Sequence, residues 1–489
     1  LINDYYNSDL TSLSIALSVL HQQAKKGHLK KQVILSDIQQ TGLPQNELYR
    51  QVNQLLEQWG IDELTGVGPE ISAHSGLFTL KKTFYNSTQS FENGIIRNRY
   101  KDSAILIKGA RTFTFEKISA LLQQKAHQTI LEIDLNALVN NLNVFRSLLR
   151  PSTKIMVMVK AFSYGSGDVE IAKLLQFQHA DYLAVAVADE GVELRQAGVQ
   201  TPVIVMNPEA HSFQNIIDFG LEPNIYSTDL LETFDKAIAE NALQHYPVHI
   251  KLDTGMNRLG FKSMEEVTTV VSLLQKTDRL KVVSVFSHLA GSDDPQLDEF
   301  TQQQFNRFET LSRKFTESFP YKIDRHILNS AGIERFPEKQ FEMVRLGIGL
   351  YGVSATNLPL QNISAFKSVV SQVKSLKPGE TVGYGRMGKI TRKTEIAVVP
   401  VGYADGFDRK LGNGKGEAFV KGKRVPVTGN VCMDMLMLDV TGLNVRASDE
   451  VEFFGPHISI TEVARKAGTI PYEILTGISQ RVKRVYLHE

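Results

Sequence analysis

The stretch that decides the fold reads Ile155-Met156-Val157-Met158-Val159-Lys160-Ala161-Phe162-Ser163-Tyr164-Gly165. Its five leading apolar residues are typical of a strand that is buried on both faces. Seven similar runs follow along the chain, and most of the intervals between them have room for a helix. These runs are 182–187, 203–206, 223–226, 248–252, 282–286, 326–328 and 343–348. Eight buried strands joined by crossovers predict a closed, parallel (β/α)8 barrel.

Two blocks flank this barrel, and the fold class is α/β. Residues 1–126 predict a small Rossmann-like α/β domain, with helices at 10–24 and 49–58 and strands at 32–35, 64–67 and 104–108. After a polar linker at 123–128, the barrel domain occupies 127–362 and includes an amphipathic helix near 135–149. Residues 363–489 predict a mainly antiparallel β domain, with strands at 396–401, 417–420, 435–440 and 450–454.

Composition excludes several classes of partner. The 54 Lys and Arg residues balance 53 Asp and Glu residues, so we expect neither nucleic acid nor a membrane surface as a partner. No run approaches the roughly 18 apolar residues of a membrane span. The single cysteine, Cys432, cannot form an internal disulfide, which predicts a cytoplasmic location. Because the chain begins at Leu1 with polar residues after it, we expect a fragment of a longer protein.

Candidate reactive groups lie at the carboxyl ends of the predicted strands, where barrel enzymes carry their chemistry. Burial of Lys160 would lower its pKa and favour the neutral amine that a Schiff base requires. A lysine that reaches solvent or pairs with a carboxylate is the more common alternative. Ser330 and the glycines after Arg345 add a hydroxyl and backbone N–H groups that suit a phosphate. A Schiff-base lysine and a phosphate site in one barrel mouth together predict pyridoxal phosphate.

Residues from about 129 to 489 closely resemble the alanine racemase family. The segments that carry the resemblance are 157–165, 401–406, 432–434 and Lys251-Leu252-Asp253-Thr254-Gly255-Met256-Asn257-Arg258-Leu259-Gly260. The resemblance implies a fold-type III pyridoxal 5'-phosphate enzyme that interconverts L-alanine and D-alanine for peptidoglycan precursors. It also implies a homodimer with shared active sites, and we expect no metal ion.

The same resemblance implies the catalytic roles. Lys160 carries the cofactor and is one of two acid–bases, and Tyr384 of the partner subunit is the other. Arg258 binds the cofactor phenolate and helps to hold the substrate carboxylate. Arg345 faces the pyridine nitrogen and, as a permanent cation, leaves that nitrogen unprotonated.

The remaining site residues follow from the resemblance as well. The phosphate-contacting positions are Tyr164, Ser330, Gly347, Ile348 and Tyr472. Other matching positions are Met433 of the partner subunit at the substrate carboxylate, His288 beneath the cofactor, and Tyr403 and Asp293 at the entrance. For the two entrance residues a plain surface role is an equal alternative. Lys251 matches a lysine that is carbamylated in many relatives, with an ordinary salt bridge or a solvated lysine as the alternative.

A glycine-rich segment elsewhere imitates a nucleotide-binding motif. Residues 383–390 match GxGxxG and nearly match GxxxxGK[ST]. Ile390 replaces the magnesium-binding Ser or Thr, and residues 391–401 predict a strand where the motif requires a helix. We therefore interpret the glycines as turns that expose Tyr384.

The front block resembles the C-terminal domain of the Mur ligase that adds D-alanyl-D-alanine to the muramoyl tripeptide. The segments Asp4-Tyr5-Tyr6-Asn7-Ser8-Asp9 and Ile107-Lys108-Gly109-Ala110-Arg111 carry this shorter match. The glycine-rich ATP loop of the ligase's central domain is missing, so we expect no ligation by this chain alone and a tethering role for the block. The alternatives are a serine or broad-specificity racemase, a non-catalytic pyridoxal-phosphate-binding barrel, which would lack the β domain, and an ATP-dependent ligase.

Overall fold

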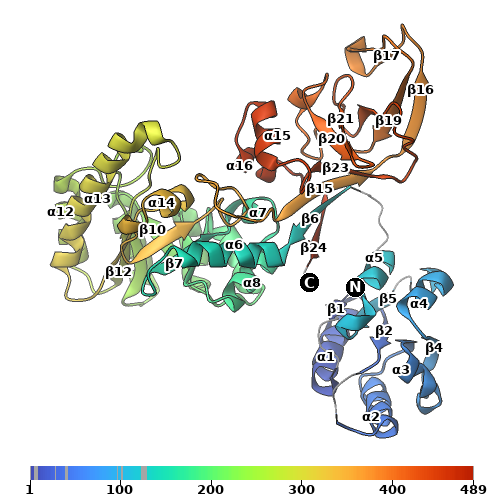
Figure 1. Cartoon of the computed structure of the whole chain (residues 1–489). Coiled ribbons are helices and arrows are strands. Elements are labelled where there is room, and N and C mark those ends of the chain that lie inside the picture. Colours follow the sequence, from blue (N-terminus) through green and yellow to red (C-terminus); the bar gives the residue numbers. More distant parts are fainter. Residues whose placement is uncertain are drawn as a thin grey trace. The chain divides into compact units, whose positions relative to one another are not determined.

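The computed structural model describes residues 2–4, 9–27, 29–38, 42–95, 97–100, 103–122 and 129–487. It divides into two compact units, Leu1–Ala126 and His127–Glu489 (Figure 1). The predicted linker at 123–128 lies outside the described residues. Within the described part of the chain, every helix is too short or too polar to cross a lipid bilayer.

The first unit is an α/β domain built on one parallel sheet of order β1-β5-β2-β3-β4. Its strands are β1 (Ile2–Asp4), β2 (Lys30–Ser36), β3 (Glu63–Val67), β4 (Lys81–Tyr85) and β5 (Ser103–Lys108). Its helices are α1 (Leu10–Gly27), α2 (Gln45–Gln58), α3 (Pro69–Ala73), α4 (Thr88–Gly94) and α5 (Glu116–Leu122). The two helices and three strands predicted here are confirmed. The short β1 and the lysine-rich edge strand β4 carry no apolar run and were not predicted.

The barrel consists of eight parallel strands in the order β13-β12-β11-β10-β9-β8-β7-β14. They are β7 (Lys154–Met158), β8 (Tyr182–Val185), β9 (Val203–Val205), β10 (Glu222–Ile225), β11 (Tyr246–Lys251), β12 (Leu280–Phe286), β13 (Asp324–His326) and β14 (Met343–Leu346). Between β13 and β14, backbone N–H groups of Glu342 and Arg345 donate to the carbonyls of Arg325 and Leu328 at 3.2 and 3.0 Å. All eight predicted strands are confirmed, and the sheet is a nearly closed barrel.

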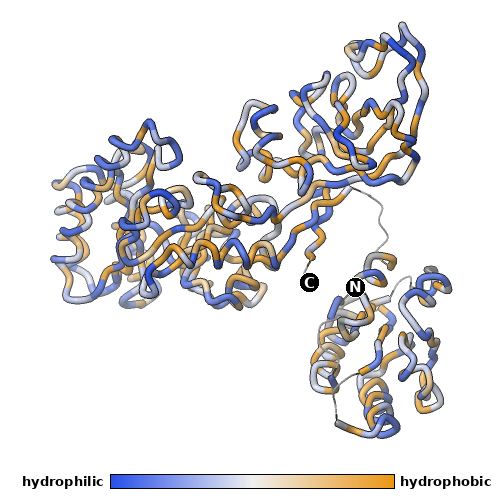
Figure 2. Tube along the Cα trace, viewed as in Figure 1, coloured by the Kyte–Doolittle hydropathy of each residue, from blue (hydrophilic) through white to orange (hydrophobic). Residues whose placement is uncertain are grey.

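A helix lies in each interval between successive barrel strands, as the spacing predicts, and α6 (Leu135–Ser147) precedes the first strand. The helices in the intervals are α8 (Asp168–Phe177), α9 (Ala188–Gln196), α10 (Phe213–Asp218), α11 (Thr228–Glu240), α12 (Met264–Leu274), α13 (Asp298–Ser318) and α14 (Ser330–Arg335). Figure 2 shows hydrophobic and hydrophilic residues alternating along these helices, as expected where one face packs on the strands. The core of this unit is continuous from the barrel into the β domain.

The β domain contains a six-stranded sheet of order β21-β20-β23-β15-β6-β24 and a three-stranded sheet of order β16-β19-β22. Its strands are β15 (Ser364–Val369), β16 (Gln372–Leu376), β17 (Thr381–Val382), β18 (Gly388–Lys389), β19 (Thr394–Val399), β20 (Glu417–Val420), β21 (Lys423–Pro426), β22 (Leu436–Asp439), β23 (Glu450–Phe454) and β24 (Lys483–Leu487). Pairing is antiparallel except between β24 and β6. The mainly antiparallel domain and its four predicted strands are confirmed.

Strand β6 (Ile130–Asp134) precedes the barrel in sequence but belongs to the sheet of the β domain. It pairs antiparallel with β15 and parallel with β24. The chain therefore starts this unit in the β domain, passes through the whole barrel and returns. No sequence pattern singled out β6, because a five-residue strand with alternating burial carries too few apolar positions.

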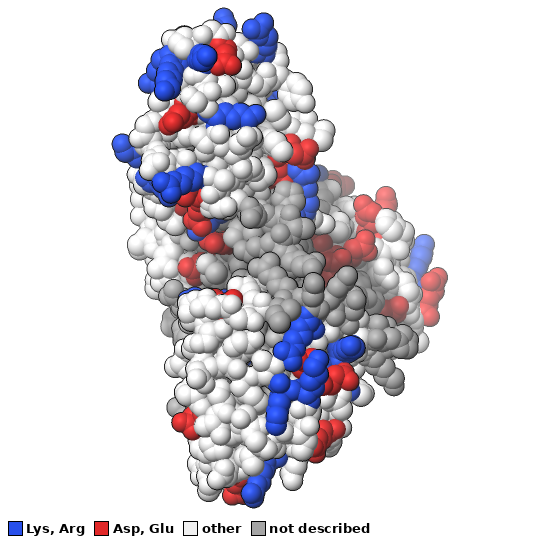
Figure 3. Space-filling model, turned by 90° about the vertical axis from the view of Figure 1, so that its right-hand side faces the viewer, with Lys and Arg blue, Asp and Glu red and all other residues white. Residues whose placement is uncertain are grey.

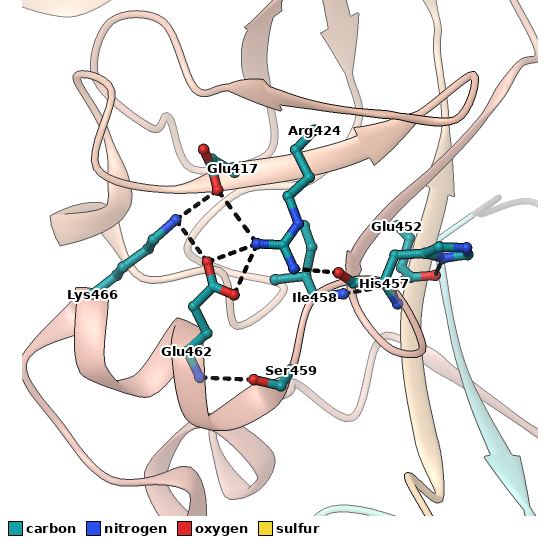
Figure 4. A network of polar contacts seen from close by, with 8 residues as sticks. All are labelled: Glu417, Arg424, Glu452, His457, Ile458, Ser459, Glu462 and Lys466. Carbon is teal, nitrogen blue, oxygen red and sulfur yellow. Dashed lines mark hydrogen bonds and ion pairs between the residues drawn. The ribbon is translucent and has the colours of Figure 1, made fainter.

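A network of ion pairs attaches helix α15 (Ile460–Ala467) to the β20–β21 hairpin (Figure 4). Arg424 lies 2.9 Å from Glu462, and Lys466 bridges Glu417 at 2.7 Å and Glu462 at 3.0 Å. Exposed pairs of this kind contribute little singly, about 0.2–1 kcal/mol each, so the network orders the surface more than it stabilises the fold. On the face that Figure 3 draws, Lys and Arg side chains lie among Asp and Glu side chains at several places of the described surface.

The segment after Lys160 is a left-handed turn that the β domain holds. Residues 161–164 have φ angles between 47° and 56°, a conformation that costs L-residues about 1–2 kcal/mol each. Arg484 donates through Nε to the carbonyl of Gly165 at 2.9 Å, and the Tyr486 hydroxyl donates to the carbonyl of Ser166 at 3.1 Å. Packing between the domains therefore offsets the cost of a turn that places the lysine.

We expect Gly165→Ala to destabilise the chain more than Gly414→Ala does. The two glycines have φ angles of 80° and 82°, so the cost of a left-handed alanine is matched. A Cβ on Gly165 would lie 2.3 Å from the carbonyl oxygen of Leu475, whereas a Cβ on Gly414 meets open space. The excess should be at least about 1 kcal/mol in the free energy of unfolding, measured by urea denaturation. Equal losses of stability in the two variants would contradict the close contact between Gly165 and the β domain.

Candidate active site

Lys160 stands where strand β7 gives way to the turn α7 (Lys160–Tyr164). Burial, followed by the positive charge of Arg258, lowers the pKa of its ammonium. The nearby carboxylate of Glu190 is occupied by backbone N–H groups, those of Ala161 at 2.7 Å and Ala186 at 2.6 Å. The site therefore favours an unprotonated amine, which is a nucleophile and a base.

Arg345 lies in the barrel interior, 3% exposed, at the third position of β14. Its Nη2 donates to the carbonyls of Ser287 at 2.6 Å and Ile327 at 3.1 Å. Its Nη1 lies 2.9 Å from Nδ1 of His326, and its Nη2 lies 3.3 Å from Nδ1 of His288. Burial lowers the pKa of the guanidinium to about 9, so it stays charged at neutral pH. Among the described residues no acceptor faces its Nε–H, which leaves that donor for a ligand.

Lys251, at the end of β11, is a second buried basic side chain of the site. Its Nζ lies 4.3 Å from the centre of the Phe286 ring, and it forms no ion pair with a described carboxylate. The side chain of Asp253 instead accepts from the N–H groups of Gly255 and Asn257 at 2.9 and 3.1 Å. Burial and the charges of the Arg345 and Arg258 guanidinium groups hold the pKa of Lys251 well below its usual range.

His288 completes this cluster from the loop that follows β12. Burial, with the charges of Arg345, Lys251 and Arg258, holds its pKa well below the usual range. The imidazole is therefore neutral, and it accepts through Nδ1 from the guanidinium of Arg345. The cluster as a whole carries positive charge that no contacting carboxylate matches among the described residues.

A phosphate-sized cradle lies beside the cations, where β13 and β14 end. The hydroxyl of Ser330 accepts from the N–H groups of Gly347 at 2.9 Å and Gly349 at 3.1 Å, so these donors gather around one point. A Cβ on Gly347 would stand 3.0 Å from the hydroxyl of Tyr164 and 3.8 Å from that of Ser330. Ile348 lies between the two glycines. Because both N–H groups donate to its oxygen, the Ser330 hydroxyl keeps its own proton to donate. This hydroxyl and that of Tyr164, beside an unfilled Cβ position, fit a phosphate group.

Tyr472 reaches this cradle from helix α16 (Pro471–Thr476) of the β domain. Its ring centre lies 5.7 Å from that of Tyr164, which in turn lies 4.7 Å from that of Tyr351. Burial, together with the negative charge of Asp293, raises the pKa of Tyr472 to about 12.

Three predicted site residues are exposed on the surface of the β domain. Tyr384 is 69% exposed, Met433 53% and Tyr403 41%. Tyr384 and Met433 share a cavity of about 710 Å³, and the N–H of Tyr403 donates to the carbonyl of Cys432. Figure 1 places β17, which directly precedes this segment, at the end of the β domain away from α7. One chain therefore brings together Lys160 and the buried cations, but not Tyr384 or Met433.

The glycines around Tyr384 form turns, as predicted. Gly383 and Gly385 have φ angles of 76° and 67°, and strand β19 follows where a nucleotide-binding loop requires a helix. The strand predicted after these glycines is confirmed.

Two residues of the site were missed from the sequence. His326, fully buried on β13, accepts from Arg345 and stacks on Phe286 with ring centres 4.8 Å apart. The carboxylate of Glu190 accepts from the backbone N–H of Ala161 in the lysine turn and from that of Ala186, which follows β8. A histidine opening an otherwise apolar run was the only signal for His326, and Glu190 gave none.

Comparison with known proteins agrees with this geometry. The family models "Alanine racemase, N-terminal domain" and "Alanine racemase, C-terminal domain" match residues 133–355 and 363–486. The alanine racemase of Methanococcus maripaludis is 36% identical over 74% of this chain and all of its own length, and alanine racemase 1 of Clostridium acetobutylicum is 38% identical over 73% of this chain and 94% of its own.

Solved structures give the same result. The alanine racemase of Clostridium difficile 630 superposes with a TM-score of 0.70 at 35% identity, over 74% of this chain and 96% of its own. That of Bartonella henselae, crystallised with covalently bound pyridoxal phosphate, superposes with a TM-score of 0.68 at 28% identity, over 74% of this chain and 99% of its own.

The depressed pKa of Lys251 predicts a pH-dependent stability difference between the wild type and Lys251→Met. Unfolding raises the lysine pKa to about 10.4, so the unfolded chain binds more protons and wild-type stability rises with pH between the two values. Methionine has no such dependence. The stability of the variant relative to the wild type should therefore be greatest at low pH and shrink as the pH rises.

The measurement is urea denaturation of the cofactor-free chain in CO2-free buffer between pH 6 and 9. Lys173→Met, in an exposed position of helix α8, is the control and should show no such trend. A difference that stays constant with pH for Lys251→Met would contradict the buried, unpaired amine.

Proposed function

Since the chain belongs to the alanine racemase family, it is an isomerase that interconverts L-alanine and D-alanine, and we propose that it does so with pyridoxal 5'-phosphate. The observation that carries the cofactor proposal is the buried guanidinium of Arg345, with the amines of Lys160 and Lys251, beside the Ser330–Gly347 cradle. A buried guanidinium without a contacting carboxylate suits an anionic ligand, and pyridoxal phosphate brings a phosphate and a phenolate. The covalently bound cofactor of the Bartonella henselae relative supports the same choice.

Several side chains would hold this cofactor. The phosphate would be bound by Ser330, Tyr164 and Tyr472 together with the backbone at Gly347 and Ile348. Arg258 would bind the phenolate, and the Nε–H of Arg345 would point at the pyridine nitrogen. His288 would lie beneath the ring. When bound, the cofactor supplies an electrophilic carbon and a ring that withdraws electrons from the α-carbon of the substrate.

Racemisation needs two acid–bases, because a proton leaves one face of the α-carbon and another returns on the opposite face. We propose Lys160 as the first, since its lowered pKa makes the neutral amine available near pH 7. Tyr384 of the partner subunit is the second. Arg345 would keep its own proton and hydrogen-bond the pyridine nitrogen without protonating it, so the bound ring would be a weaker electron sink and transamination would be limited.

The exposure of Tyr384 and Met433 supports a homodimer with shared sites. Tyr384 and Met433 are exposed at the far end of the β domain, and Met387 and Met435 beside them are 55% and 48% exposed. A cluster of exposed apolar side chains suits a protein interface. We propose that it covers the barrel mouth of a second chain, where Met433 and Arg258 flank the substrate carboxylate and Asp293 and Tyr403 line the entrance.

We further propose that Lys251 is carbamylated. Its depressed pKa provides the neutral amine that reacts with CO2, and the nearby Arg345 and Arg258 guanidinium groups favour a negative product. The carbamate would orient Arg258 toward the phenolate.

The first unit is proposed to derive from the C-terminal domain of a D-alanyl-D-alanine-adding Mur ligase and to tether the racemase near that ligase. Strands β1 and β5, from the two segments that resemble the ligase, pair in the sheet, and Lys108 bridges Asp4 at 2.9 Å. Residues 5–8 of the first segment lie outside the described residues. D-alanine for peptidoglycan would be made in the cytoplasm, in keeping with the single Cys432.

The purified chain with added pyridoxal phosphate should form D-alanine from L-alanine, and Lys160→Ala should lose at least about 10²–10⁴-fold of the rate. Chiral chromatography measures the product, and the exposed-site variant Lys173→Ala should retain wild-type activity. Cofactor binding without turnover of L-alanine would direct the test to serine. If serine also failed, the non-catalytic barrel would replace the racemase.

Mixing Lys160→Ala chains with Tyr384→Phe chains should restore activity that neither variant has alone. In a mixed dimer one of the two sites receives the native lysine and the native tyrosine together, so recovery approaches a quarter of the wild-type rate for random mixing. The measurement needs mixed dimers verified by mass spectrometry. Verified mixed dimers without recovery would refute shared sites.

A further inference from the structure

Five neighbouring barrel strands contribute one side chain each to a single hydrogen-bonded chain. From β10, Oε2 of Glu222 lies 2.7 Å from Nε2 of His249 on β11. Nδ1 of His249 lies 2.6 Å from Oγ of Ser284 on β12, and the same oxygen lies 3.0 Å from Nε2 of His326 on β13. Nδ1 of His326 lies 2.9 Å from Nη1 of Arg345 on β14. A continuous path therefore crosses the barrel interior from a carboxylate to the guanidinium of the site.

The two ends of this chain determine its direction. A guanidinium can only donate and a carboxylate can only accept. Nδ1 of His326 is therefore the acceptor for Arg345, and its proton sits on Nε2 and is donated to Ser284. The serine hydroxyl then donates to Nδ1 of His249, whose Nε2–H donates to Glu222. Every donor meets an acceptor only if both histidines carry their proton on Nε2.

Burial supports this assignment. His249, Ser284 and His326 are fully buried, so a donor without an acceptor would be costly at each of them. Burial and the charge of Arg345 hold the pKa of His326 well below its usual range, so the ring is neutral. Arg345 itself contacts no carboxylate among the described residues, and Glu222 is the acidic side chain to which this chain connects it.

We propose that Glu222 is a positioning residue for the reaction, which acts through this chain to hold the guanidinium of Arg345 toward the cofactor ring. Its charge polarises the successive hydrogen bonds and makes Nδ1 of His326 a stronger acceptor. The role parallels that of carboxylates that orient metal-bound histidines from behind. The inference rests on the proposed cofactor site, with Arg345 at the pyridine nitrogen.

Without the carboxylate, the Nε2–H of His249 has no acceptor. His249 regains an acceptor for its N–H if the proton moves to Nδ1, because Nδ1–H can donate to the hydroxyl oxygen of Ser284. The serine hydroxyl then has no acceptor on His249 and would donate to Nε2 of His326 instead. The proton of His326 would have to move to Nδ1, where it would face the N–H donors of Arg345. Loss of Glu222 therefore weakens the anchor of the guanidinium from a distance.

The test compares Glu222→Met, Glu222→Gln and Glu342→Gln by ¹⁵N NMR of histidine-labelled, cofactor-free full chain. Wild type should show His249 and His326 protonated on Nε2 alone. Glu222→Met should shift His249 toward the Nδ1–H tautomer, and Glu222→Gln, which keeps an acceptor oxygen, should not. Glu342 directly precedes β14 and pairs with Arg325, but it is not part of the hydrogen-bonded chain. Glu342→Gln should therefore leave the signals of His249 and His326 unchanged.

The same variants are then loaded with pyridoxal phosphate and assayed. Glu222→Met should lower kcat for L-alanine about tenfold, as loss of a supporting carboxylate does at metal sites, with KM changed less than about twofold. Glu342→Gln should retain the wild-type kcat. If Glu222→Met does not fold, Ser284→Ala breaks the chain at its centre and should change the His326 signal and kcat in the same way.

Either of two results would overturn the proposal. One is a wild-type His326 that is protonated on Nδ1 or on both nitrogens. The other is a folded chain-breaking variant with wild-type histidine signals and wild-type kcat. The tautomers are measured without cofactor. A protein that does not racemise alanine would therefore be distinguished from one in which the hydrogen-bonded chain is not formed as proposed.

Discussion

The buried guanidinium of Arg345 is the constraint on which the rest of the site depends. A charge that is 3% exposed and touches no described carboxylate must be satisfied by neutral acceptors. These come from the ends of neighbouring strands, namely the carbonyls of Ser287, Ile327 and His326 and two imidazole nitrogens. A shift of β14 against β13 would leave several N–H donors of Arg345 without acceptors at once. The register of the strands that close the barrel is therefore fixed by the same side chain that we propose to face the cofactor.

The positive charge of Arg345 also contributes to the pKa shifts of the neighbouring basic groups. It lowers the pKa of Lys160, Lys251 and His288, in each case together with burial. The lysines become available as neutral amines, and the imidazole becomes an acceptor. Burial is the larger cause for all three groups, and for Lys160 the charge of Arg258 precedes that of Arg345. The carboxylates of Glu190 and Asp253 are occupied by backbone N–H groups.

Sequence reasoning reached the barrel because its strands are short apolar runs with a clear spacing, and each of the eight was found. It located Lys160, Ser330 and Arg345 because reactive groups follow strand ends. It could not find β6, whose partners β15 and β24 are more than 200 residues away in sequence. It also missed the polar chain from Glu222 to Arg345. Which side chains meet inside a barrel depends on the register of all the strands, and a single sequence does not state that register.

The β domain supports the site at two separate places, and this constrains how the active molecule is assembled. Through α16 and β24 it holds the left-handed turn that positions the lysine of its own chain. At its other end it presents Tyr384 and Met433, which that lysine does not reach. Both ends belong to one folded body with a core continuous with the barrel. In the proposed homodimer each β domain would therefore fix one acid–base of its own site and supply the other to its partner. The geometry between the two bases would then depend on the dimer interface as directly as on the fold of either chain.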